Sequence, residues 1–139
     1  MPSFSKTSLD RLNTCHQDLI TLFTEVIKYY DCTVVCGHRG EADQNKAFAE
    51  GKSTKKWPNS NHNVKPSEAV DVSPYEKGGI DWSWEQGLFF AGFVLGISER
   101  LYADGKIKHK IRSGVDWNDD RNIHDTKFKD APHFEIIKK

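Results

Sequence analysis

The chain has 139 residues, a length typical of one domain with its own hydrophobic core. Hydrophobic residues make up 37% and aromatic residues 12%, which is the composition of a globular rather than a disordered protein. The 20 Lys and Arg residues balance the 20 Asp and Glu residues, and a net charge of zero argues against attachment to nucleic acid or to an anionic membrane through the overall field. We therefore expect one neutral domain over residues 1–139.

No segment has the pattern of a signal peptide or of a membrane span. The most apolar stretch, residues 88–97, has about half the length that a membrane span needs, and the first 17 residues contain no apolar run of signal-peptide length. The three cysteines, Cys15, Cys32 and Cys36, are an odd number without the spacing of a disulfide framework. We interpret them as buried thiols in a reducing cytosol, since a Cys32/Cys36 metal pair would need a second such pair.

The first half of the chain predicts one long helix, a strand and a short helix. Apolar residues recur at helical spacing over residues 8–30, and Thr7 or Ser8 can cap the start of this helix. A β-branched strand, a short helix and a polar loop follow at residues 33–36, 41–50 and 52–65.

The second half predicts further strands around a second long helix. Residues 69–72 form a strand that ends at Ser73-Pro74, and residues 84–102 form a helix that Asp81 caps and Gly105 closes. Strands at residues 111–115 and 133–137 flank a polar loop at residues 116–130. Because helices and strands do not alternate regularly, we expect an α+β fold in which a small, mainly antiparallel sheet packs with two long helices.

Four residues in this pattern can carry metal-dependent chemistry. Asp71 lies in the middle of an apolar strand, where burial costs several kcal/mol unless a positive group meets the carboxylate. His62 precedes it by nine residues, and His133 follows Asp130 by three. Two imidazoles and one carboxylate match a catalytic zinc site with an open position for water, and Asp130 is placed to move a proton. Scattered His and Asp residues are more often solvated, so spacing alone leaves both interpretations open.

The motifs around these residues resemble a known family. Ser60-x-His62, Ala69-x-Asp71, Gly37-x-Arg39 and a C-terminal Asp130-x-x-His133-x-Glu135 together resemble the zinc D-alanyl-D-alanine carboxypeptidase (VanY-like) family. Within it, the chain is most similar to the compact L-alanyl-D-glutamate endopeptidases that phages use as endolysins. Residues 71–75, 80–82 and 114–118 support this closer match, which covers nearly the whole chain. The resemblance implies the peptidase fold shared with hedgehog domains, with a zinc site on the sheet.

The resemblance also implies a role for each matching residue. The implied zinc ligands are His62, Asp71 and His133. Asp130 is implied as the catalytic acid/base and Arg39 as the group that binds a substrate carboxylate and stabilises the oxyanion. The residues implied to line the substrate groove are Arg39, Gln44 and Ser60. One departure is that nine positions separate His62 from Asp71 where the compact pattern has seven, which predicts a longer loop around residues 65–67.

The implied activity is zinc-dependent hydrolysis of the L-Ala–D-Glu amide bond in peptidoglycan stem peptides, which causes cell-wall lysis. We expect a monomeric catalytic domain with no separate wall-binding domain, no nucleic-acid partner and no membrane insertion. Without a signal peptide it would accumulate in the host cytoplasm and act after release. The alternatives are a D,D-carboxypeptidase acting on D-Ala-D-Ala termini and a zinc-stabilised, non-catalytic binding module like the hedgehog domain. An intact Asp130 together with Arg39 favours an enzyme.

A second cation is suggested by the polar loop that follows the third predicted strand. Side-chain oxygens occur at alternate positions, as in a calcium loop, at Asp116, Asn118, Asp120, Asn122 and Asp125. Arg121 and Lys127 stand where an EF-hand needs Gly and Glu, which favours a plain solvated loop over Ca²⁺ binding.

Overall fold

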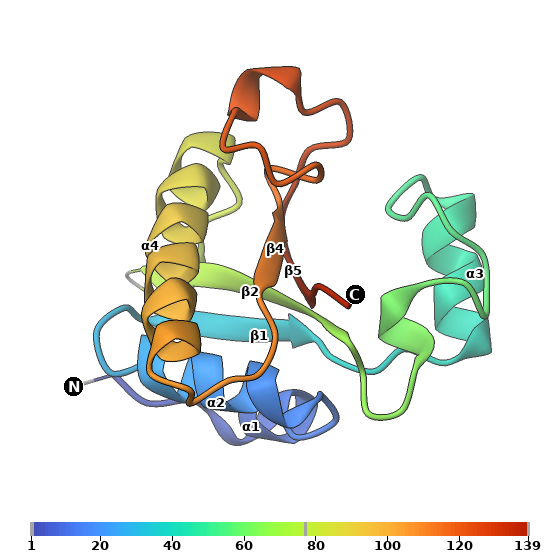
Figure 1. Cartoon of the computed structure of the whole chain (residues 1–139). Coiled ribbons are helices and arrows are strands. Elements are labelled where there is room, and N and C mark those ends of the chain that lie inside the picture. Colours follow the sequence, from blue (N-terminus) through green and yellow to red (C-terminus); the bar gives the residue numbers. More distant parts are fainter. Residues whose placement is uncertain (1, 77, 139) are drawn as a thin grey trace.

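The computed structural model describes residues 2–76 and 78–138 (Figure 1). Within these ranges no helix is long and apolar enough to cross a membrane. The elements in chain order are α1 (Lys6–Leu12), α2 (Gln17–Val26), β1 (Cys32–Cys36), α3 (Glu41–Ala49), the 3₁₀ turn η1 (Asn61–Asn63), β2 (Ala69–Glu76), β3 (Gly79–Ile80), α4 (Trp84–Ala103), β4 (Ile111–Gly114), the 3₁₀ turn η2 (Ile123–Asp125) and β5 (Asp130–Ile136).

An antiparallel sheet forms the centre of the molecule. Its strand order is β1-β2-β5-β4, and β3 pairs with the outer part of β2. Helix α4 packs against α2 and against β2, β4 and β5. Figure 1 shows the sheet between α4 on one side and the segment that carries α3 on the other. The expected α+β class and antiparallel sheet are confirmed.

Alternation along the strands gives the sheet two different faces. Val70 and Val72 of β2 and Phe134 of β5 are completely buried against the helices. Because successive side chains point to opposite faces, Asp71 and His133 lie on the other face, where they are paired across the two strands. Burial of the apolar face, at roughly 25 cal/mol per Å² of apolar surface, therefore holds the polar pair in register on the open face.

The first predicted helix is wrong in its length. The structure breaks residues 8–30 into α1 and α2, and Thr14 to His16 form the break. Cys15 pairs with Ser67 as an isolated bridge, and the Oγ1 atom of Thr14 accepts a hydrogen bond from the backbone N–H of His38. These three residues are hydrogen-bonded to other parts of the chain, so the helix ends at Leu12 and begins again after His16.

Both predicted helix caps are also wrong. The side chain of Ser5, rather than Thr7 or Ser8, caps α1 by accepting a hydrogen bond from the backbone N–H of Ser8. Ser83 caps α4, while Asp81 accepts a hydrogen bond from Ser83 itself and lies one turn outside the helix. Several Ser, Thr and Asp residues stand near each helix start, and the local sequence does not distinguish among them.

Two strands are longer than predicted. Strand β2 continues through Pro74 to Glu76, because pairing with β1 and then with β3 extends past the proline. Strand β5 begins at Asp130 rather than at His133, and Asp130 pairs with Gly114 of β4. A Cβ atom on Gly114 would overlap the backbone of Asp130, so this close approach of the two strands requires glycine.

Candidate active site

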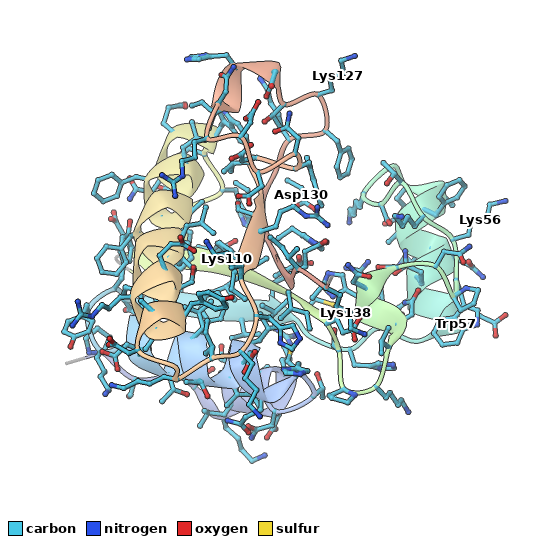
Figure 2. All side chains as sticks on the ribbon, viewed as in Figure 1. Lys56, Trp57, Lys110, Lys127, Asp130 and Lys138 are labelled. Carbon is cyan, nitrogen blue, oxygen red and sulfur yellow. The ribbon has the colours of Figure 1, made fainter. Side chains whose placement is uncertain are left out.

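A cleft of about 1030 Å³ lies between the open face of the sheet and the segment that carries α3. Its walls contain the predicted site residues Arg39, Ser60, His62, Asp71, Asp130 and His133. Figure 2 shows Asp130 on the side of β5 that faces α3, whereas Lys56 and Trp57 lie on the far side of the α3 segment, away from the sheet. The structure therefore brings together every predicted site residue except Gln44.

Asp71 is the centre of this arrangement. Its Oδ1 atom lies 3.3 Å from Nε2 of His62 and 3.4 Å from Nδ1 of His133. Its Oδ2 atom lies 3.3 Å from a guanidinium nitrogen of Arg39. The carboxyl group of Asp130 lies 4.0 Å from Nδ1 of His133. One carboxylate thus faces two imidazoles and one guanidinium.

The turn η1 holds His62 with one ring nitrogen facing Asp71. Ser60 caps this turn by accepting a hydrogen bond from the backbone N–H of His62, and Asn63 completes a capping box. The Nδ1 atom of His62 lies 2.8 Å from the carbonyl oxygen of Gly37. Because a carbonyl only accepts, Nδ1 carries the proton, and Nε2 is the ring nitrogen that faces Asp71.

Two buried atoms at this point have no hydrogen-bond partner among the described residues. They are Nε2 of His62 and Oδ1 of Asp71. They lie 3.3 Å apart, but their alignment is not that of a hydrogen bond. Buried polar atoms are nearly always satisfied, so two unsatisfied ones that face each other indicate a missing ligand. A divalent cation that accepts both lone pairs would satisfy them.

His133 is held by Glu135, to which the sequence analysis gave no role beyond its place in the C-terminal motif, and Glu135 is held in turn by Arg112, which the sequence analysis did not name. The Nε2 atom of His133 lies 2.7 Å from Oε1 of Glu135, and Arg112 binds the other side of this carboxylate, with Nε at 3.2 Å. Burial favours the neutral form of Glu135, but the hydrogen bonds from His133 and Arg112 outweigh it and lower its pKa to about 2. The indole ring of Trp117 packs 4.9 Å from the imidazole of His133. A charged carboxylate thus directs Nδ1 of His133 towards Asp71.

The metal-ligating atoms form two overlapping groups around Asp71. In each group one atom per residue lies within 4.8 Å of the others: Cys36, His62 and Asp71 form one, and Asp71, Asp130 and His133 form the other. The two predicted imidazole ligands therefore belong to different groups that share Asp71. Two imidazoles and a carboxylate are donors that Zn²⁺ prefers, and together with the unsatisfied atoms they fit a zinc site.

Charge in the cleft changes three pKa values. Burial opposes ionisation of Asp71, but the two histidines outweigh it and hold its pKa well below the usual range. Burial likewise opposes a charge on His62, yet Asp71 raises the pKa of this imidazole to about 10. For Asp130, burial and then the charge of Asp71 raise the pKa to about 6. Asp71 thus attracts positive charge, whether a proton or a metal ion, and Asp130 titrates near neutrality.

Gln44 lies behind Arg39 and not on the cleft wall. Its side chain is completely buried, and its Oε1 atom accepts a hydrogen bond of 3.0 Å from Arg39. Its amide nitrogen donates to Ser53 Oγ and to the carbonyl of Lys55. These bonds join Gln44 to Arg39 and tie α3 to residues 53–55, and its expected contact with the substrate stays a prediction.

The longer loop between His62 and Asp71 does not enter the cleft. Backbone hydrogen bonds join Ser67 to Thr14 and to His16, and Ser67 is completely buried. The extra residues thus pack against the turn between α1 and α2.

The loop proposed for calcium is held by hydrogen bonds within the chain. Asp116 accepts from the backbone N–H groups of Asp120 and Arg121, and Asn118 donates to Asp125. Within the described ranges, none of the groups of three close metal-ligating atoms involves this loop. Ca²⁺ binding there stays a prediction.

The fold and the site define a hydrolytic enzyme, because a carboxyl group that titrates near neutrality stands beside a donor set suited to a metal ion, inside a cleft. The family described as phage L-alanyl-D-glutamate peptidase matches residues 2–137. The chain belongs to this family and is an L-alanyl-D-glutamate peptidase that acts on peptidoglycan.

One relative supports this assignment, and one solved structure supports the fold. An L-alanyl-D-glutamate peptidase of Escherichia phage T5 is 30% identical over 146 aligned residues, which cover 96% of this chain and 97% of the relative. The crystal structure of the Serratia marcescens L-Ala D-Glu endopeptidase ChiX superposes with a TM-score of 0.73 at 22% identity. The superposition covers 97% of this chain and 90% of that one. At this identity, the structural match supports the fold.

Proposed function

We propose that the chain hydrolyses the L-Ala–D-Glu amide bond with a zinc ion held by His62, Asp71 and His133. The observation that carries this proposal is the pair of buried, unsatisfied atoms, Nε2 of His62 and Oδ1 of Asp71. When bound by these residues, a zinc ion would act as a Lewis acid and would lower the pKa of a coordinated water molecule towards 7. Glu135 and Gly37 hold the two imidazoles in the tautomers that such an ion needs.

Asp130 is proposed as the acid/base. Its side chain lines the cleft beside His133, and its pKa of about 6 allows it both to accept and to release a proton near neutral pH. It would take the proton of the attacking water and give it to the leaving amine. Close pairing with Gly114 fixes the backbone that presents this carboxylate.

Arg39 is proposed to bind the substrate. D-Glu continues the stem peptide through its side chain, so its α-carboxylate is free beside the scissile bond. A guanidinium offers a fork of donors that matches a carboxylate. Arg39 lines the cleft wall, where Gln44 and Asp71 hold its guanidinium in place. The same positive group would stabilise the oxyanion. Ser60 shapes the wall through the turn that carries His62.

The proposed biological role is that of a phage endolysin, which acts as a monomer and degrades the wall after release from the host cytoplasm. The similarity to a phage T5 peptidase along almost the full length of both chains supports this role.

Muropeptide analysis tests the proposal. Purified peptidoglycan is incubated with zinc-loaded protein, with protein treated with a chelator, and with Asp130→Asn, and the products are identified by mass spectrometry. We expect a new L-Ala carboxyl end and a new D-Glu amino end with zinc-loaded wild-type protein only. Release of free D-Ala would instead indicate a D,D-carboxypeptidase, and equal activity after zinc removal would contradict the metal mechanism.

A further inference from the structure

Cys36 lies beside the proposed zinc ligands because of an irregularity in strand β1. Val34 pairs with Val72, but the register then shifts, so that Cys36 and not Val35 lies opposite Asp71. Regular alternation would place Cys36 on the buried face with Val34. The bulge turns it instead towards the open face, where it lines the cleft.

The thiol converges on the two atoms that lack partners. One donor atom each from Cys36, His62 and Asp71 lies within 4.8 Å of the other two. His62 is only 2% exposed, and its Nε2 atom has no hydrogen-bond partner among the described residues. The Sγ atom has one weak contact, 3.5 Å to the carbonyl oxygen of Gly37. Its lone pairs are therefore available beside the two unsatisfied atoms.

We propose that Cys36 is a metal donor, so that a thiophilic divalent cation such as Cd²⁺ binds through Cys36, His62 and Asp71. The proposal rests on the proposed function, because two of these residues are the zinc ligands assigned there. A thiolate favours soft cations over Mg²⁺ or Ca²⁺. On binding, the S–H bond breaks and its proton leaves to solvent, while the sulfur keeps the electron pair and forms the bond to the metal. Thiolate and carboxylate then balance the double positive charge.

This binding mode competes with hydrolysis. His133 belongs to the other donor group, with Asp130, and not to the one that contains Cys36. A cation held by Cys36 would take up His62 and Asp71, which are two of the three proposed zinc ligands, and would fill the position that the catalytic ion needs. Soft cations should therefore inhibit the enzyme by displacing zinc.

The other two cysteines provide internal controls. Burial raises the pKa of Cys15 and of Cys32 to about 12, so both remain protonated at neutral pH. Cys32 lies in the same strand as Cys36 but is buried in the core. Cys32→Ala is therefore the control for Cys36→Ser: it also removes a thiol, but it leaves the proposed donor Cys36 in place.

The test is a Cd²⁺ titration of the metal-free protein, followed by ultraviolet absorption from thiolate-to-metal charge transfer. We expect this band in the wild-type protein and in Cys32→Ala, and its loss in Cys36→Ser. Cd²⁺ affinity should fall at least ~10-fold in Cys36→Ser, because a hydroxyl is a poor donor for a soft cation. Circular dichroism establishes that each variant is folded.

A second measurement uses the unaltered protein. Bound Cd²⁺ should protect Cys36 from alkylation by iodoacetamide, as read by peptide mass spectrometry. Cd²⁺ that binds without the charge-transfer band and without this protection overturns the proposal. The proposed function can still hold in that case, and it is supported if the wild-type protein binds zinc and His62→Ala does not. Wild-type protein that binds no zinc contradicts the proposed function itself.

Discussion

The molecule contains two clusters of the same composition, two histidines and one aspartate each, and the side chains have different roles in the two. The catalytic cluster consists of His62, Asp71 and His133, and the clamp cluster of His16, Asp18 and His109. In both clusters the centroids of the two imidazole rings lie 5.2 Å apart. The three residues of the clamp cluster form a single group of metal-ligating atoms within 4.8 Å of one another, whereas those of the catalytic cluster belong to two groups that share Asp71. Composition and proximity therefore do not distinguish a metal site from a structural one.

Hydrogen bonds do distinguish them. In the clamp cluster, Oδ2 of Asp18 accepts from the backbone N–H groups of Lys108 and His109 and from Nδ1 of His109, at 2.8–3.0 Å. Nδ1 of His16 accepts from the backbone N–H of Asp18 and so caps α2. The hydrogen bonds that Asp18 accepts therefore join the start of α2 to the segment before β4. In the catalytic cluster, by contrast, the facing atoms of His62 and Asp71 are left unsatisfied. We infer that unsatisfied atoms, rather than residue types, mark the cation site.

Metal content gives the largest expected difference between the clusters. His62→Ala should abolish zinc binding and peptidase activity, whereas His109→Ala should keep one zinc ion per chain and full activity. Metal analysis of the purified, zinc-reconstituted proteins measures this. Two zinc ions per wild-type chain, reduced to one in His109→Ala, would show that the clamp cluster also binds metal and would break the comparison.

Asp130→Asn tests the catalytic cluster with its metal in place. We expect kcat to fall by about 10²–10⁴-fold, the usual contribution of a general acid/base, with zinc content unchanged. Rates on purified peptidoglycan, together with metal analysis, test this. Retention of most of the rate would remove Asp130 from the mechanism, and loss of zinc would make it a ligand.

Asp18→Ala should affect stability and not catalysis. The change leaves two partly buried backbone N–H groups and one imidazole without their acceptor, which costs about 2–3 kcal/mol of unfolding free energy. Urea unfolding of the metal-free protein measures the loss. The control is Asp10→Ala, which removes an exposed ion pair with Lys6 and should change little. A loss for Asp18→Ala no larger than that of the control would show that the clamp does not hold the fold.

The acid sensitivity of the metal-free protein should depend on Glu135. Its pKa is lowered from 4.5 to about 2, so its contribution to stability is complete above pH 4.5 and is lost as the pH falls towards 2. We expect about 2 kcal/mol from this one group after allowing for its neighbours. Urea unfolding at about pH 6 and about pH 3 should therefore show a smaller pH effect in Glu135→Gln than in the wild-type protein. Equal pH effects would contradict the assigned ionisation.

Much of the fold can be predicted because it depends on local patterns. Apolar periodicity identifies α4 and the strands, and alternation in β2 places Asp71 apart from Val70 and Val72. The break between α1 and α2 also has a local sign, since Cys15 is the only apolar residue between Leu12 and Leu19. The predicted helix nevertheless spans this gap in the apolar pattern, and the contact of Cys15 with Ser67 shows that the helix breaks there.

The rest of the site depends on strand register, which a single sequence does not reveal. Alternation from His133 predicts Glu135 on the same face, but its partner Arg112 follows only from the pairing of β4 with β5. Cys36 is a stronger example, because the bulge in β1 moves it to the face opposite the one that alternation predicts. Irregular pairing, more than residue type, limited what could be predicted here.

The smallest expected effect distinguishes two roles of Arg39. Lysine keeps the charge but lacks the fork of donors, so Arg39→Lys should lower kcat/KM about tenfold, or about 1.4 kcal/mol, with zinc affinity unchanged. A synthetic stem peptide with an amidated D-Glu α-carboxylate should show the same loss with the wild-type enzyme and little further loss with the variant. The alternative is that Arg39 serves the cluster through its 3.3 Å contact with Asp71. In that case the variant would bind zinc more weakly, and the losses from substitution and amidation would add.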